Sequence, residues 1–129
     1  KEIEQHERRR AEDEATALTT AYAVLGEPQL RGAHLLELVG RPLVEDDDAS
    51  LLGVDFLGDV MEVREELASQ PENEELGVIR STNRDRMDAL VKELNAAFAA
   101  EEIDEARVLV AKLRYLRRIE EEIHEQSEV

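Results

Sequence analysis

Hydrophobic residues recur every three or four positions along the chain, and no segment shows the strict alternation of a half-buried strand. This pattern predicts helices at about residues 10–25, 28–39, 55–67, 74–100 and 103–123. Short connections between long helices are typical of antiparallel neighbours. The sequence therefore predicts an all-α protein.

The turn residues divide these helices into two groups. Gly26 and Pro28 separate the first two helices, and Gly40 ends the second. The prediction is an N-terminal helical hairpin at 1–40, a linker at 41–54 that contains Pro42 and an acidic run, and a three-helix bundle at 55–129. The hairpin should pack against one end of the bundle and give an L-shaped chain. It should share a hydrophobic junction with the first bundle helix, because four of its residues are too apolar for one face: Leu35, Leu36, Leu38 and Val39.

Two apolar stripes predict the bundle core. The first bundle helix, which we expect Asp55 to cap, presents Phe56, Val60, Val63 and Leu67. The last helix presents Leu109, Leu113, Leu116, Ile119 and Ile123. The middle of the long helix, residues 80–86, is wholly polar, so we expect thin or water-bridged packing there.

Beside the first stripe lies a second group of side chains. At 100° per residue, Leu57, Met61 and Arg64 fall about a quarter-turn to one side, with Glu65 just beyond and Glu62 further round. A large apolar pair beside carboxylates favours a docking surface. The alternative is that the pair merely widens the core-facing stripe.

Tyr115 flanks the stripe of the last helix rather than sharing it. It is a candidate surface aromatic, and the alternative is a partly buried core residue with its hydroxyl in water. If Leu57, Met61 and Tyr115 dock a partner together, all three should be accessible in the free chain.

Composition narrows the function. The 129 residues suffice for one domain, alone or with an appended piece, and the chain carries a net charge of −16. Nucleic acid and anionic membranes are therefore poor partners, and a basic protein surface is the natural complement. The absence of cysteine excludes disulfides, thiolate metal sites and cysteine nucleophiles. The chain opens on Lys1 rather than Met, so we expect a piece of a longer protein.

Several motifs resemble a known family. Residues of the predicted hairpin resemble the end of a J-domain: Leu18, Ala21, Tyr22, Leu25, Pro28, Arg31, Leu35 and Leu36. Residues 56–67 (FLGDVMEVREEL) and 112–116 (KLRYL) resemble the C-terminal domain of the HscB family, the J-type co-chaperones of iron–sulfur cluster assembly. The resemblance covers about residues 12–123.

The resemblance implies a co-chaperone with no catalytic residues, metal or cofactor of its own. Its bundle would bind an IscU-type scaffold protein, and its J-domain would recruit a DnaK/HscA-class ATPase, in the mitochondrial matrix or alternatively the bacterial cytoplasm. Carried over by position, the scaffold contacts are Leu57, Met61, Glu62, Arg64, Glu65 and Tyr115. No histidine is followed by Pro-Asp, the tripeptide that stimulates the ATPase, so the chain as given would bind the scaffold only.

Two other functions compete with this hypothesis. Glu121 and His124 have the spacing of di-iron carboxylate bundles, but neither other histidine has an acid three residues before it, so chance spacing is favoured. A generic helical interaction or oligomerisation module would explain the apolar stripes equally well and would predict self-association.

Overall fold

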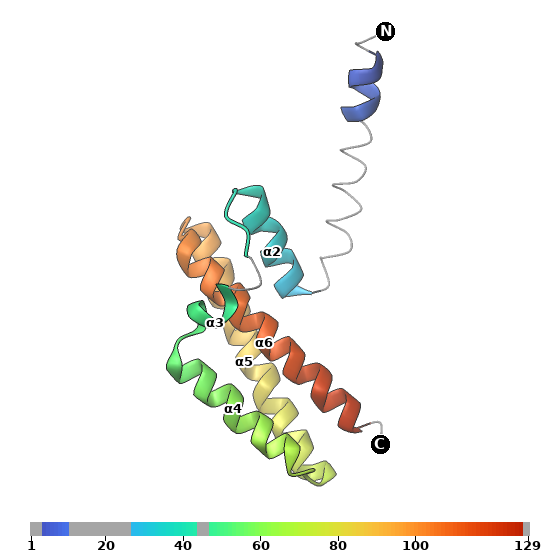
Figure 1. Cartoon of the computed structure of the whole chain (residues 1–129), viewed down its shortest axis with the longest axis vertical. Helices are drawn as coiled ribbons and strands as arrows, with labels where there is room; N and C mark the ends of the chain where they lie inside the picture. The colour runs from blue at the N-terminus through green and yellow to red at the C-terminus, as the bar shows by residue number, and fades with distance from the viewer. Residues whose placement is uncertain (1–3, 11–26, 44–46, 128–129) are drawn as a thin grey trace.

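The computed structural model describes residues 4–10, 27–43 and 47–127, and the described part is helical with no strand. Residues 4–10 are helical, followed by α2 (Pro28–Leu38), α3 (Asp47–Leu52), α4 (Val54–Ala68), α5 (Asn73–Ala99) and α6 (Ile103–Ser127) (Figure 1). The all-α prediction is confirmed. The observed bounds of α4, α5 and the start of α6 lie within one residue of the predicted bounds, because long periodic helices between clear breaks leave little ambiguity.

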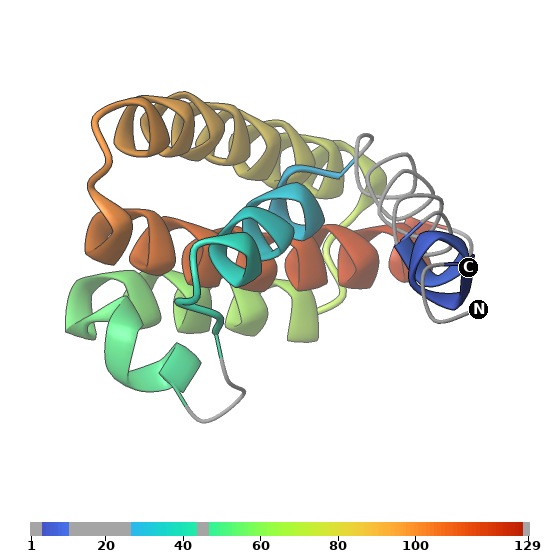
Figure 2. The same cartoon turned by 90° about the horizontal axis from the view of Figure 1, so that it is seen from above.

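Helix α6 is the central element. It packs against α2, α3, α4 and α5, and the view from above places it between α5 and α4 (Figure 2). The predicted apolar stripe of α6 is confirmed as buried, and small or branched residues extend the buried surface around the helix. The buried residues of α6 are Ala106, Leu109, Val110, Ala111, Leu113, Leu116, Ile119 and Ile123.

The core divides into two clusters along α6. The α2-side cluster consists of Leu36, Leu94, Ala97, Ala106, Leu109, Val110 and Leu113. The α4-side cluster consists of Val60, Leu67, Leu76, Leu116, Ile119 and Ile123. In each cluster, residues of α5 and α6 join residues of one further helix, so α6 supports α2 near its beginning and α4 near its end. Of the predicted α4 stripe, Val60 and Leu67 are buried, whereas Phe56 and Val63 are half-buried.

The polar middle of α5 packs directly on α6, whereas on its other side it lines a groove toward α4. The expectation of thin packing was therefore wrong for the α6 side only. Asn83 is 4% exposed, and its side-chain amide donates to the backbone oxygen of Leu116 at 3.0 Å and to the Glu120 carboxylate at 3.2 Å. The exposed Arg84 donates to the same carboxylate at 2.9 Å. A buried amide with satisfied hydrogen bonds therefore joins α5 and α6 where apolar residues are missing.

The start of α4 differs from the prediction. Gly53 occupies the position before the helix with φ 81°, and no side chain caps the first turn. Asp55 lies inside that turn, where its charge interacts favourably with the helix dipole. The predicted linker also contains α3, whose Leu52 is 4% exposed. The connection between α2 and α4 is therefore partly helical and partly anchored in the core.

Helix α2 ends as predicted but packs differently. The N–H of Gly40, at φ 75°, donates to Glu37 O, and the N–H of Arg41 donates to Leu36 O, which is the glycine-terminated end of a helix. Leu36 is fully buried, whereas Leu38 is 69% exposed and Val39 51% exposed.

The expected junction between α2 and the first bundle helix was wrong, because Leu36 packs among residues of α5 and α6. The other helix of the predicted hairpin falls on residues 11–26, outside the described residues, and the predicted L shape depends on it.

Gly32 is the point of closest approach between α2 and the bundle. A Cβ atom at this position would lie 2.7 Å from Cγ2 of Val110 and 3.1 Å from Cδ2 of Leu94. Gly77, in α5, has nothing within 4 Å of the equivalent position. Substituting each glycine by alanine therefore compares a tightly packed helical position, Gly32, with an open one, Gly77, where only helix propensity changes.

We expect Gly32→Ala to destabilise the chain by about 1–3 kcal/mol through overpacking against Val110. Gly77→Ala should instead stabilise it by about 0.5–1 kcal/mol, because alanine loses less backbone entropy in a helix. Urea denaturation followed by circular dichroism measures both. Equal effects of the same sign would contradict the close docking of α2.

Candidate protein-docking surface

Helices α4 and α6 run side by side in the same direction, and polar contacts join them at both ends. Near the start of α4, Lys112 Nζ lies 5.6 Å from the centroid of the Phe56 ring. Further along, Arg64 pairs with Glu122 at 3.3 Å, and the side-chain amide of Gln126 donates to the backbone oxygen of Leu67 at 2.9 Å. These contacts fix which side of α4 faces α6.

Three of the predicted contact residues lie on that side of α4. Leu57 and Met61 precede Arg64 by seven and three residues, and spacings of three, four and seven keep side chains on one helical face. Met61 is 63% exposed and Leu57 is half-buried. The core-widening alternative is therefore wrong for Met61 and partly right for Leu57.

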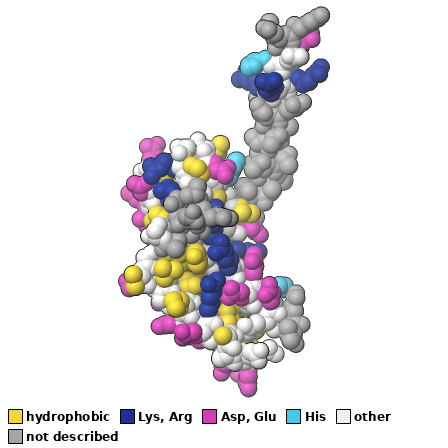
Figure 3. All heavy atoms as spheres, in the orientation of Figure 1, with side chains coloured by type: hydrophobic (Ala, Val, Ile, Leu, Met, Phe, Trp, Pro, Cys, Tyr) yellow, Lys and Arg dark blue, Asp and Glu magenta, His cyan; other side chains and the backbone are white. Residues whose placement is uncertain are grey.

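Tyr115 lies on the side of α6 that faces α4. Its ring packs at the edge of the α4-side cluster and is half-buried, and the guanidinium carbon of Arg118 lies 5.2 Å from the ring centroid. Figure 3 shows apolar side chains gathered over the beginning of α4, next to a column of Lys and Arg side chains along α6. The face formed by α4 and α6 therefore carries four of the predicted contact residues: Leu57, Met61, Arg64 and Tyr115. Among the three uncharged side chains, that of Met61 is the most exposed to solvent.

The two predicted acidic contacts lie elsewhere on α4. Glu62 lines the groove between α4 and α5, together with Asp59 and Glu66. Glu65 is exposed and follows Met61 by one helical turn. Glu65 therefore lies beside Met61, whereas Glu62 lies on the α5 side of the helix.

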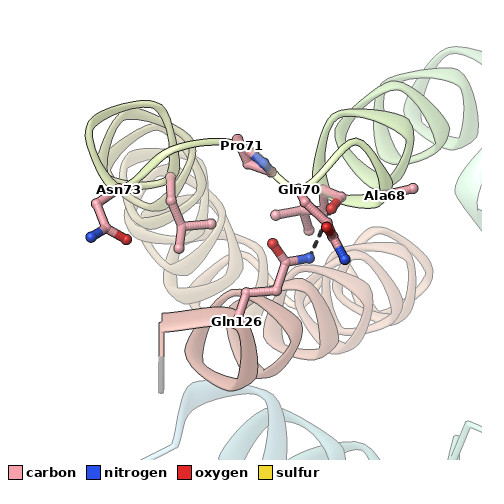
Figure 4. A pocket seen from close by; sticks show the side chains of 7 residues that line it. Ala68, Gln70, Pro71, Asn73 and Gln126 are labelled. Atoms are coloured by element: carbon pink, nitrogen blue, oxygen red, sulfur yellow. Dashed lines mark hydrogen bonds between the residues drawn. The ribbon is translucent and has the colours of Figure 1, made fainter. Parts of the chain in front are cut away.

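A hollow at the α4–α5 end of the bundle contains no ionisable side chain in its lining (Figure 4). Its lining residues are Leu67, Ala68, Gln70, Pro71, Asn73, Leu76 and Gln126. Amides and apolar groups of this kind provide no general acid or base. The lining of this hollow therefore offers no group for acid–base catalysis.

Neither a metal site nor a membrane span is found in the described ranges. No group of three His, Asp or Glu side chains there is placed to hold a metal ion. Glu121, which has the di-iron spacing with His124, instead lies 3.8 Å from Arg117. None of the helices described is both long and apolar enough to cross a membrane.

The family of this chain follows from its C-terminal helices. Residues 53–124, which contain α4, α5 and most of α6, match the family model of the HSCB C-terminal oligomerisation domain. The chain belongs to the HscB family.

Several members of the family are similar over most of the chain. The mouse iron-sulfur cluster co-chaperone protein HscB is 31% identical over 92% of the chain and 50% of its own length. The human protein of the same name is 30% identical over 88% of the chain and 48% of its own length. The co-chaperone protein HscB homolog of Acinetobacter baylyi is 29% identical over 79% of the chain and 58% of its own length. The chain thus spans about half the length of these relatives, and no solved structure matches it.

Sequence reasoning missed the two cations that flank Tyr115. Lys112 and Arg118 lie three residues before and three residues after it, so each of them neighbours Tyr115 on the surface of α6, one on either side. That spacing was the available signal. The aromatic partners of the two cations, Phe56 and Tyr115, became apparent only from the packing of α4 on α6.

We expect Met61 to contribute little to the stability of the free chain. Because its side chain is largely in water, Met61→Ala should change the free energy of unfolding by no more than about 0.5 kcal/mol. Leu67→Ala, on the same helix but 3% exposed, should cost about 2–5 kcal/mol. Chemical denaturation of the two variants makes the comparison, and similar losses for both would place Met61 in the core.

Proposed function

We propose that this chain is the scaffold-binding part of a co-chaperone of iron–sulfur cluster assembly. One observation carries the proposal: a large apolar side chain, Met61, is 63% exposed beside half-buried Leu57 and Tyr115, inside the region that matches the HscB C-terminal domain. The names of the mouse and human relatives give the process. Their identity to this chain supports carrying that process over to it.

The partner that we propose is an IscU-type scaffold protein. The resemblance of residues 56–67 and 112–116 to the family's motifs supports six contact residues as the ones we propose: Leu57, Met61, Glu62, Arg64, Glu65 and Tyr115. A DnaK/HscA-class chaperone would receive the scaffold in the mitochondrial matrix or the bacterial cytoplasm. Since this sequence contains no His-Pro-Asp tripeptide, we propose scaffold binding, and not ATPase stimulation, as the activity of these residues.

The packing of the surface supports this role. Tyr115 is already packed against the α4-side cluster and Leu57 is half-buried, so little side-chain freedom would be lost when a partner covers them. Met61 has most of its surface still to bury, and burial of apolar surface stabilises a complex by about 25 cal/mol per Å². A small number of such central anchors supplies most of the binding energy in protein interfaces.

We expect the double variant Leu57→Ala/Met61→Ala to bind an IscU-type scaffold at least about 30-fold more weakly, the equivalent of about 2 kcal/mol. Leu38→Ala is the matched control, because Leu38 is also an exposed apolar residue, at 69%, but lies on α2. Isothermal titration calorimetry of the folded variants measures the dissociation constants. Equal binding by wild type and double variant would contradict the proposal, and concentration-dependent self-association lost in the double variant would favour an oligomerisation module instead.

Charge should act mainly on the association rate. The net charge of −16 should attract a basic scaffold surface over long distances, so the on-rate should fall as ionic strength rises from low to physiological values. Stopped-flow mixing measures it, with Glu62→Gln/Glu65→Gln expected to lower the rate and Asp85→Asn/Glu93→Gln, on exposed positions of α5, as the control. An on-rate that does not respond to salt would mean that the acidic surface serves solubility only.

A further inference from the structure

Helix α4 separates two surfaces of opposite charge, although the chain as a whole is strongly acidic. On its α6 side lie Arg64, which pairs with Glu122 at 3.3 Å, and two further cations, Lys112 and Arg118. On its α5 side lies a groove that Asp59, Glu62 and Glu66 line. Met61 lies on the exposed face of the same helix.

The two cations of the α6 side are held in place without being neutralised. Lys112 lies 5.6 Å from the Phe56 ring centroid and Arg118 lies 5.2 Å from that of Tyr115. Cation–π contacts of this kind orient a charge over a ring but leave its charge in place. Among the residues that the structure describes, neither cation forms an ion pair with a carboxylate. Two positive charges that belong to no ion pair in the described part of the chain thus border the apolar surface at Tyr115.

The groove on the α5 side has the opposite character. It measures about 260 Å³, its apolar lining comes from Val63, Val78 and Ile79, and Arg86 is the one cation among its lining residues. Three carboxylates against one guanidinium leave it negative. The distance between the two charged surfaces is the width of one helix, so a partner that covers Met61 reaches both.

From this arrangement we infer that the surface of the scaffold that docks on α4 is bipolar. It presents an acidic side chain to Lys112 and Arg118, and basic side chains to Asp59 and Glu62. The inference rests on the proposed function and adds to it the orientation of the scaffold. A scaffold rotated by half a turn about Met61 would place like charges together on both sides of α4, and such contacts are costly enough to reject it.

A charge reversal separates this inference from simple attraction between an acidic chain and a basic scaffold. The variant Lys112→Glu/Arg118→Glu changes the net charge from −16 to −20. If overall charge alone governs binding, this variant binds a basic scaffold faster and at least as tightly as wild type. If the scaffold is bipolar, it binds at least about 10-fold more weakly, the loss expected for like charges placed across an interface.

Two controls accompany the reversal. Arg80→Glu/Lys92→Glu makes the same change in net charge on α5, at positions that line neither side of α4, and should not weaken binding. Since Lys112 is half-buried, the milder Lys112→Gln/Arg118→Gln variant, with its melting temperature checked, tests the same contact and should weaken binding about 3-fold or more by removing charge-assisted contacts.

Surface plasmon resonance with an immobilised IscU-type scaffold distinguishes the outcomes. Binding of the reversed variant at wild-type strength or above, while Leu57→Ala/Met61→Ala still loses binding, overturns the bipolar arrangement and leaves the proposed function standing. Absence of binding by the wild-type chain overturns the proposed function, and this inference with it. Scaffold variants in which one acidic residue is changed to lysine would then identify the acidic contact. The variant at that contact should bind the reversed chain more tightly than the wild-type scaffold does.

Discussion

The burial of α6 on several sides is the constraint on which the rest of the structure depends. Its large residues form the stripe that packs on α4 and α5, and its small or branched residues near the beginning let other helices approach closely. Ala106 and Val110 are fully buried there, and Gly32 of α2 meets Val110 without room for a Cβ atom. Loss of this packing would release α2, α3, α4 and α5 together, because each of them packs on α6.

This dependence also explains why an apolar surface stays open on α4. Helix α4 is anchored through a narrow buried edge, Val60 and Leu67, and through two polar contacts: Arg64 pairs with Glu122 of α6, and Gln126 of α6 donates to the backbone oxygen of Leu67. That anchorage leaves the outer part of the helix in water, Met61 included. The proposed affinity for a partner and the stability of the bundle therefore depend on different residues of the same helix, and selection can change one without losing the other.

The sequence predicted the helices well and their neighbours less well. Helical period and breaks are local properties, so α4, α5 and α6 began within a residue of the predicted positions. Which helix α2 contacts is not a local property. Its apolar residues were expected to pack on α4, whereas Leu36 packs on α5 and α6 and Leu38 and Val39 are exposed. The spacing of apolar residues also says nothing about amide side chains, so it could not predict the hydrogen bonds of Asn83 to α6. The candidate site was predicted less well than the helices but better than their contacts. Leu57, a quarter-turn from the core stripe, is half-buried, so it agrees in part with a docking residue and in part with a core residue.

An exposed apolar surface favours self-association, and the charge distribution opposes it. Two copies that met through Met61 would bring together molecules of net charge −16 each, and that repulsion extends about a Debye length at physiological salt. The local cations at Lys112 and Arg118 are too few to reverse this long-range field, but at contact distance they act on individual side chains of the partner. Overall charge therefore discourages wrong encounters at a distance, whereas the two cations beside Tyr115 discriminate between orientations after contact. The acidic composition and the basic strip on α6 are compatible because they act over different distances.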